Sequence, residues 1–62
     1  MQDWFISWVY MKNGEVDGRG WNIRRDHAGA EAADVASRYI NDLSKESGKP
    51  ADAFILTAMS KV

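Results

Sequence analysis

The sequence contains no cysteine and only one proline, and the first of these absences narrows what the chain can be. Without cysteine there is neither a disulfide nor a thiolate metal site. Small domains usually compensate for a thin core with disulfides, a metal or association with another chain. Association is therefore the route that stays open to these 62 residues. The absence of cysteine also fits a reducing compartment, and we expect a cytoplasmic protein.

A large net charge and long apolar runs are also missing. Eight basic and nine acidic side chains leave a net charge of −1, too small to attract nucleic acid or an anionic membrane from a distance. The apolar runs are short, whereas a bilayer-spanning helix needs about 20 apolar residues. The first residues lack the basic and apolar regions of a signal peptide. We expect no leader, no membrane segment and no membrane partner.

Residue types suited to catalysis are few and scattered. His27 is the only histidine, and without a cysteine partner its ordinary role is that of a solvated loop residue. The aspartates show no metal-loop spacing, and no serine has the context of a nucleophile elbow. Gly18-Arg19-Gly20 is too short for a phosphate-binding loop and precedes a predicted strand. We predict no catalytic, metal-binding or cofactor-binding residue, and hence no enzyme.

The segment from Trp4 to Met11 is aromatic and β-branched, which predicts a strand. Both of its alternating sets of side chains are apolar, as in a central strand that is covered on both faces. One set is Trp4, Ile6, Trp8 and Tyr10, and the other is Phe5, Val9 and Met11 together with Ser7.

Asn13-Gly14 predicts the hairpin turn that follows, because both residues tolerate the positive φ of a type I′ turn. This turn pairs Lys12 with Glu15, Ile6 with Trp21 and Trp4 with Ile23. It thus directs Trp21 and Ile23 to the Trp4 side of the sheet. Asp17-Gly18 is a rival turn with the same face assignment, whereas a longer open loop would change it.

The second predicted strand, Arg19 to Arg25, alternates between apolar and polar residues, as an edge strand with one solvated face does. The residues predicted to point away from Trp21 and Ile23 are Gly18, Gly20, Asn22 and Arg24.

From about Ala28 to Ser47 the apolar period becomes helical. The predicted buried stripe consists of Ala28, Ala32, Val35, Ala36, Tyr39, Ile40 and Leu43. Asp26 is the expected N-cap and Gly48 the expected C′ residue of the helix. The segment from Ala53 to Val62 is predicted as a final strand, with continued helix as the alternative.

These elements predict a single α+β domain over residues 1–62, with the order β-β-α-β. The first strand belongs in the centre of a three-stranded antiparallel sheet of strand order 2-1-3. The helix packs on one face and connects the second strand to the third by a right-handed crossover. Its stripe is rich in alanine, so we place it against the bulky Trp4, Ile6 and Trp8.

The opposite face of the predicted sheet has no cover within the chain. Contiguous exposed apolar patches usually mark a binding surface. We therefore predict a homodimer or higher oligomer, with a host protein as the other candidate partner. The predicted interaction face consists of Phe5, Val9, Met11, Ile55 and Met59.

Binding of single-stranded nucleic acid is the alternative function, because sheet aromatics flanked by basic residues can stack bases. The acidic balance and the absence of a basic stripe argue against it. In that case Phe5 would be joined by the basic residues Lys12, Arg19, Arg24 and Arg25.

The run Trp4-Phe5-Ile6-Ser7-Trp8-Val9-Tyr10, with Gly18-Arg19-Gly20 after it, resembles a loose group of very short phage and prophage proteins. Members of that group begin with an F-x-S-[YW]-x-Y strand and a G-x-G hairpin. They end in a strand similar to Ala53-Phe54-Ile55-Leu56. The present chain differs in having a longer, alanine-rich helix. The resemblance implies an accessory protein of a mobile element that acts by binding, and it assigns no functional residue.

Overall fold

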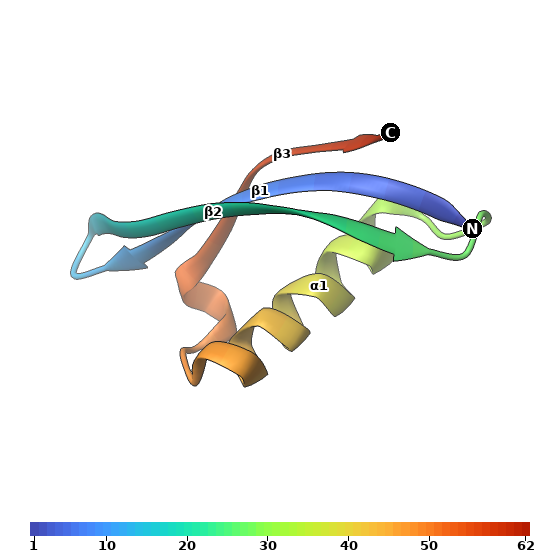
Figure 1. Cartoon of the computed structure of the whole chain (residues 1–62). Helices are drawn as coiled ribbons and strands as arrows, with labels where there is room; N and C mark the ends of the chain where they lie inside the picture. Colours follow the sequence, from blue (N-terminus) through green and yellow to red (C-terminus); the bar gives the residue numbers. More distant parts are fainter.

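The computed structural model describes the whole chain, Met1–Val62, as a sheet with one helix packed beneath it (Figure 1). The elements are β1 (Gln2–Lys12), β2 (Glu15–Asp26), α1 (Ala32–Ser47), the short 3-10 helix η1 (Ala51–Ala53) and β3 (Phe54–Lys61). The strand order is β2-β1-β3, and both neighbouring pairs are antiparallel. The predicted α+β fold, strand order and final strand are therefore confirmed.

The hairpin between β1 and β2 turns at the predicted residues. Asn13 and Gly14 have φ angles of 54° and 78°, the two positive values that a type I′ turn requires. Lys12 lies opposite Glu15, as predicted, so the strands leave the turn with opposite charges facing each other.

A bulge in β2, just beyond the turn, changes the register of the hairpin. Tyr10 lies opposite Gly18 whereas Met11 lies opposite Val16, so Asp17 is an extra residue in β2. A shift of one residue moves every later side chain to the other face of the sheet. Trp21 therefore lies opposite Ser7, and the prediction that it pairs with Ile6 on the helix side was wrong.

The same shift places the other side chains of β2 on the opposite face from the one predicted. Ile23 lies opposite Phe5 rather than Trp4, so it too lies on the face away from α1. Gly20 and Arg24, predicted on that outer face, lie opposite Trp8 and Trp4 on the helix side instead.

A second bulge, in β3, changes the predicted positions of two residues. Ser7 lies opposite Ala58 and Trp8 opposite Leu56, so Thr57 is the extra residue. Met59 consequently lies opposite Ile6 and packs against the buried core, which corrects its assignment to the uncovered face. Ala58, which regular alternation from Phe54 would turn toward the helix, lies opposite Ser7 and is exposed.

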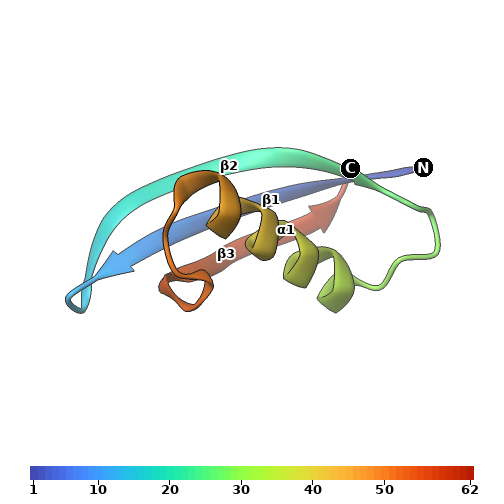
Figure 2. The same cartoon turned by 90° about the horizontal axis from the view of Figure 1, so that it is seen from below.

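The core lies between α1 and the face of the sheet that carries Trp4 and Ile6. Ile6 and Val35 are fully buried, and Trp4 and Tyr39 are buried beside them. Figure 2 shows α1 lying diagonally across this face. The predicted packing of the helix over Trp4, Ile6 and Trp8 is confirmed. The partly buried residues around the core are Trp8, Ala30, Leu43, Leu56 and Met59.

The helix is shorter at its start than predicted. It begins at Ala32 with Glu31 as N-cap, and no side chain caps it. Asp26, the expected N-cap, instead ends β2, and Ala28 is an exposed loop residue. The C-terminal end matches the prediction, because Gly48 has a φ of 72° and donates its N–H to the Ser44 carbonyl at 2.9 Å.

The Trp8 indole fixes the packing between the sheet and the helix. Its Nε1 donates to the Tyr39 hydroxyl at 3.1 Å, and its ring meets Phe54 edge-on at 5.5 Å between centroids. The ring lies directly over Gly20 of β2. A Cβ atom at Gly20 would be 2.5 Å from Cζ2 of Trp8, closer than real Cβ contacts allow. Glycine at this position is therefore required by the indole.

We predict that Gly20→Ala lowers the free energy of unfolding by about 1–3 kcal/mol, because the Trp8 ring must move and strain the packing. The measurement is urea denaturation followed by circular dichroism. Gly18→Ala is the matched control in the same strand, since its Cβ would lie 3.9 Å from Cβ of Tyr10, an ordinary contact. Equal losses of stability in the two variants would contradict the role assigned to Gly20.

Candidate functional site

The face of the sheet turned away from α1 is uncovered along the molecule (Figure 1). Trp21 is 68% exposed and Ile55 is 50% exposed, values unusual for large apolar side chains in a sheet. Both lie on this face, Trp21 from β2 opposite Ser7 and Ile55 from β3 opposite Val9. The residues that the strand alternation gathers here are Asp3, Phe5, Ser7, Val9, Met11, Val16, Arg19, Trp21, Ile23, Arg25, Ile55, Ala58 and Ser60.

A shallow hollow lies at the middle of this uncovered face. Its volume is about 360 Å³, and its lining includes Phe5, Trp21, Arg19 and Ser7. The rings of Phe5 and Trp21 are 6.0 Å apart and tilted by 32°. The hydroxyls of Ser7 and Thr57 are hydrogen-bonded at 2.8 Å. The hollow thus combines aromatic surface, hydroxyl groups and one guanidinium, a set suited to binding a flat or apolar group.

The predicted interaction face is only partly assembled. Phe5, Val9 and Ile55 lie together on the uncovered face. Met11 lies on the same side near the hairpin end, opposite Val16. Met59 is absent from the face because the bulge in β3 turns it into the core.

The sequence interpretation missed Trp21 and Ile23 as members of the uncovered face. The signal for their position is the pair Asp17-Gly18, because a glycine inside a strand pattern is typical of a bulge. The pair was interpreted as a rival turn, and a turn there leaves the face assignment unchanged.

The predicted basic residues are spread over different parts of the sheet. Arg19 lines the hollow and has no ion-pair partner. Arg25 is on the same face, where its Nε donates to Oδ1 of Asp3 at 2.9 Å. This hydrogen bond lowers the pKa of the Asp3 carboxyl and raises that of the guanidinium. Lys12 lies at the hairpin end opposite Glu15.

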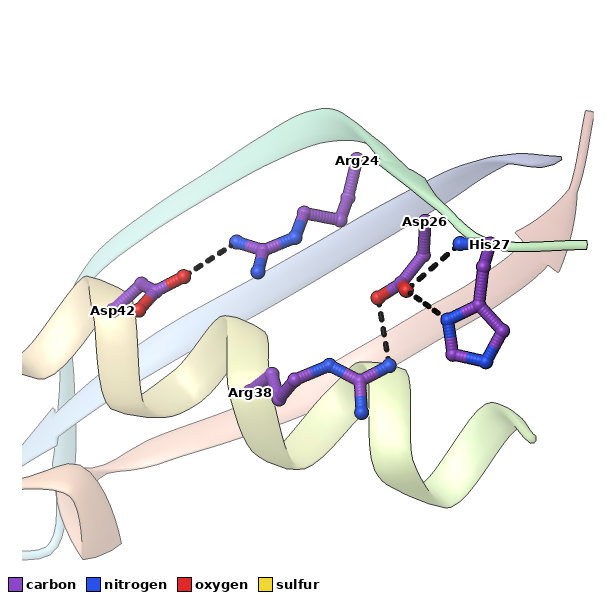
Figure 3. Close-up of polar contacts among 5 residues, drawn as sticks. All are labelled: Arg24, Asp26, His27, Arg38 and Asp42. Carbon is purple, nitrogen blue, oxygen red and sulfur yellow. Dashed lines mark hydrogen bonds and ion pairs between the residues drawn. The ribbon is translucent and has the colours of Figure 1, made fainter. Parts of the chain in front are cut away.

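Arg24 is on the helix side of the sheet, which corrects its place beside Phe5 in the nucleic-acid interpretation. Figure 3 shows its guanidinium directed at α1, where Nη1 is 2.7 Å from Oδ2 of Asp42. The same guanidinium lies over the Tyr39 ring at 5.9 Å. Arg24 therefore joins β2 to the helix and is not available on the uncovered face.

Asp26 makes the second connection between β2 and α1 (Figure 3). Its Oδ2 accepts a hydrogen bond from Nη2 of Arg38 at 2.8 Å, and its Oδ1 accepts the backbone N–H of His27 at 2.9 Å. The Arg38 guanidinium, followed by the His27 N–H, lowers the pKa of the Asp26 carboxyl. The charged form of Asp26 is thus favoured in the folded chain.

His27 is exposed and its Nδ1 lies 3.0 Å from Oδ1 of Asp26. Neither residue lines the hollow on the uncovered face. The chain brings together no group of three His, Cys, Asp or Glu side chains that could hold a metal ion. The one helix, α1, does not have the length and hydropathy needed to cross a membrane.

Comparison with protein-family models, with curated proteins and with solved structures found no match. Function is therefore inferred from the side chains of the uncovered face.

We predict that Asp26→Asn lowers stability at neutral pH and that the loss disappears in acid. The lowered pKa means that the charged carboxyl stabilises the fold fully above about 3.9, its ordinary value. That stabilisation is lost as pH falls through the lower pKa of the folded state. Urea denaturation of the wild type and of Asp26→Asn at a series of pH values measures the difference in their free energies of unfolding.

Asp52→Asn is the control for this pH series, because Asp52 is exposed and forms no ion pair. It should follow the wild type at every pH. A difference between the wild type and Asp26→Asn that stays constant down to strong acid would show that the carboxyl charge is not what joins β2 to α1.

Proposed function

We propose that the protein is a non-enzymatic interaction module that binds another protein through the uncovered face of its sheet. The observation that carries the proposal is Trp21, which is 68% exposed beside Phe5 at the hollow. Tryptophan is among the residues that contribute most to protein interfaces, and it does so when a partner buries it. A partner seated on this face would remove Trp21, Ile23 and Ile55 from water together.

The composition and size of the face support a protein as partner. Apolar side chains occupy its middle, and the ion pair of Arg25 with Asp3 lies toward one end, an arrangement similar to the apolar core and polar rim of interfaces. The molecule is 37 Å long and has an accessible surface of 4170 Å², and a standard interface of about 800 Å² per partner would take about a fifth of it.

The resemblance of the first strand and hairpin to short phage and prophage proteins supports a role as an accessory protein. In that setting the partner is a protein of the host. The motif residues that carry the resemblance include Phe5, which lines the hollow, and Ser7, whose hydroxyl bonds Thr57 there.

A second candidate function is binding of single-stranded nucleic acid. The observation in its favour is that Phe5, Trp21 and Arg19 line the same hollow. Aromatic rings stack on bases, and a neighbouring cation contacts the phosphates. With Arg24 turned toward α1, however, Arg19 and Arg25 are the arginines left on this face, so few phosphates can be neutralised.

We predict that Trp21→Lys and Ile55→Lys each weaken binding of the captured protein at least about 30-fold, as the loss of a central apolar contact does. The immobilised protein is used to capture proteins from host lysate, and the affinity for the purified captured protein is then measured for each variant. Asn41→Lys is the control, because it adds the same charge to an exposed position of α1.

Binding that is equal in all these folded variants would exclude the uncovered face as the binding surface. Titration of a fluorescein-labelled thymidine oligonucleotide tests the second candidate in the same variants, with the fluorescence anisotropy of the label as the readout. Binding with a Kd below ~1 μM at ~150 mM salt, lost in Trp21→Lys, would favour nucleic acid over protein, because non-specific binding at that salt has Kd values of about 10⁻⁴–10⁻⁶ M.

A further inference from the structure

Arg19 differs from the other arginines of the chain in having no carboxylate partner. The ion pairs of the other three are Arg24 with Asp42, Arg25 with Asp3, and Arg38 with Asp26. Figure 3 shows the first and the last of them. Asp17, two residues before Arg19 in the bulge of β2, does not pair with it either. The five N–H donors of the Arg19 guanidinium are therefore left without an anion.

Arg19 lies where a partner seated on the uncovered face would cover it. It comes two residues before Trp21 in β2, on the same face of the sheet. Across the sheet Arg19 lies opposite Val9, and Val9 lies opposite Ile55. Trp21 and Ile55 belong to the two outer strands, so a partner that buries both extends across β1 and over the hollow that Arg19 lines.

Covering Arg19 with apolar surface alone would remove a charged group from water and give it no partner. A guanidinium keeps its charge in proteins. A buried charge is destabilising unless an opposite charge pairs with it. None of the residues that line the hollow is acidic. The negative group must therefore come from the partner.

The donors at the hollow suit a carboxylate. The guanidinium presents a planar fork of N–H groups that matches the two oxygens of a carboxylate. Ser7 and Thr57 share one hydrogen bond, in which one hydroxyl donates to the other. The hydrogen of the accepting hydroxyl is then free to donate to a further acceptor. Phe5 and Trp21 add apolar surface beside these donors, so an apolar group next to the carboxylate would be in contact with the two rings.

We propose that the partner presents an aspartate or glutamate next to a large apolar side chain. The carboxylate pairs with Arg19, and the apolar side chain packs against Phe5 and Trp21. This inference rests on the proposed function and deepens it, because it states the chemistry of the protein segment that the face binds. Nucleic acid suits the hollow less well, since it carries a phosphate at every nucleotide and the hollow offers one unpaired arginine.

The test is selection of short random peptides, displayed on phage, by the immobilised full chain. We expect the selected peptides to be enriched in aspartate and glutamate next to apolar residues. The peptide that binds most tightly is then labelled with fluorescein and titrated with the wild type and with Arg19→Gln, with fluorescence anisotropy as the readout. Arg19→Gln should bind it at least about tenfold more weakly, as the loss of a hydrogen bond between charged groups does.

Lys45→Gln is the matched control, because it removes the same charge from an exposed position of α1 and should bind the peptide as the wild type does. A second peptide carries asparagine or glutamine in place of the acidic residue. It should bind the wild type at least about tenfold more weakly than the acidic peptide does. Arg19→Gln should bind both peptides about equally, since the pairing is missing in each case.

Selected peptides without acidic residues would overturn the inference. Equal losses of affinity in Arg19→Gln and Lys45→Gln would do the same, as would an amide peptide that binds Arg19→Gln as much more weakly as it binds the wild type. A thymidine oligonucleotide that binds with a Kd below ~1 μM at ~150 mM salt, and is lost in Arg19→Gln, would assign the guanidinium to phosphates and overturn it too.

Trp21→Ala, which removes the ring and adds no charge, separates this inference from the proposed function. Peptides that lose affinity for Trp21→Ala but bind Arg19→Gln as they bind the wild type would keep the uncovered face as the binding surface and overturn only the carboxylate. Peptides that bind Trp21→Ala as tightly as the wild type would overturn both proposals. Failure of the wild type to select any peptide would overturn both as well.

Discussion

Asp17 adds to β2 one residue that has no partner in β1, and the direction of every later side chain in the strand follows from it. With the bulge, Gly20 lies beneath the Trp8 indole, which is then free to reach the Tyr39 hydroxyl. Arg24 points to the same side and reaches Asp42 of α1. The packing of sheet and helix therefore depends on small or helix-directed groups occupying the inner positions of β2.

The cost of this arrangement is the exposure of Trp21 and Ile23. Burying a large apolar side chain stabilises a fold by about 1.5–3 kcal/mol, and the chain forgoes that contribution at both positions. A short alanine-rich helix offers little room for a third tryptophan beside Trp4 and Trp8, because interiors are packed without spare volume. The apolar surface that the core cannot hold is displayed on the uncovered face. β2 thus provides the exposed tryptophan of that face, and it also forms one edge of the sheet.

Much of the fold could be predicted from the sequence, because its signals are local. Asn13-Gly14 determines the turn, the two-sided apolar pattern of Trp4 to Met11 determines the central strand, and Gly48 marks the end of the helix. The start of the helix could not be located as well, since Asp26 fits an N-cap but is engaged by Arg38 at the end of β2. The preference of aspartate for N-cap positions does not reveal that the Asp26 carboxylate binds Arg38 instead of capping the helix.

The composition of the candidate site was harder to predict. It depends on whether an extra residue interrupts the alternation of side chains in β2 and in β3. One extra residue, Asp17, moved Trp21 and Ile23 onto the uncovered face and Arg24 off it. Another, Thr57, moved Met59 into the core while Ile55, which precedes the bulge, kept its predicted side. Residues of β1 such as Phe5 and Val9 were placed correctly, since no bulge interrupts their alternation. A single inserted residue carries little signal in the sequence, yet it decides which side chains a partner can reach.

The most direct test of the bulge is the pattern of Hα–Hα nuclear Overhauser effects across the hairpin. Opposed residues that do not exchange hydrogen bonds have their Cα atoms about 4.5 Å apart, which makes their Hα contacts strong. The register described here predicts strong contacts between Ser7 and Trp21 and between Phe5 and Ile23. Strong contacts between Ser7 and Gly20 and between Phe5 and Asn22 would show a hairpin without the bulge and would contradict the account of the uncovered face.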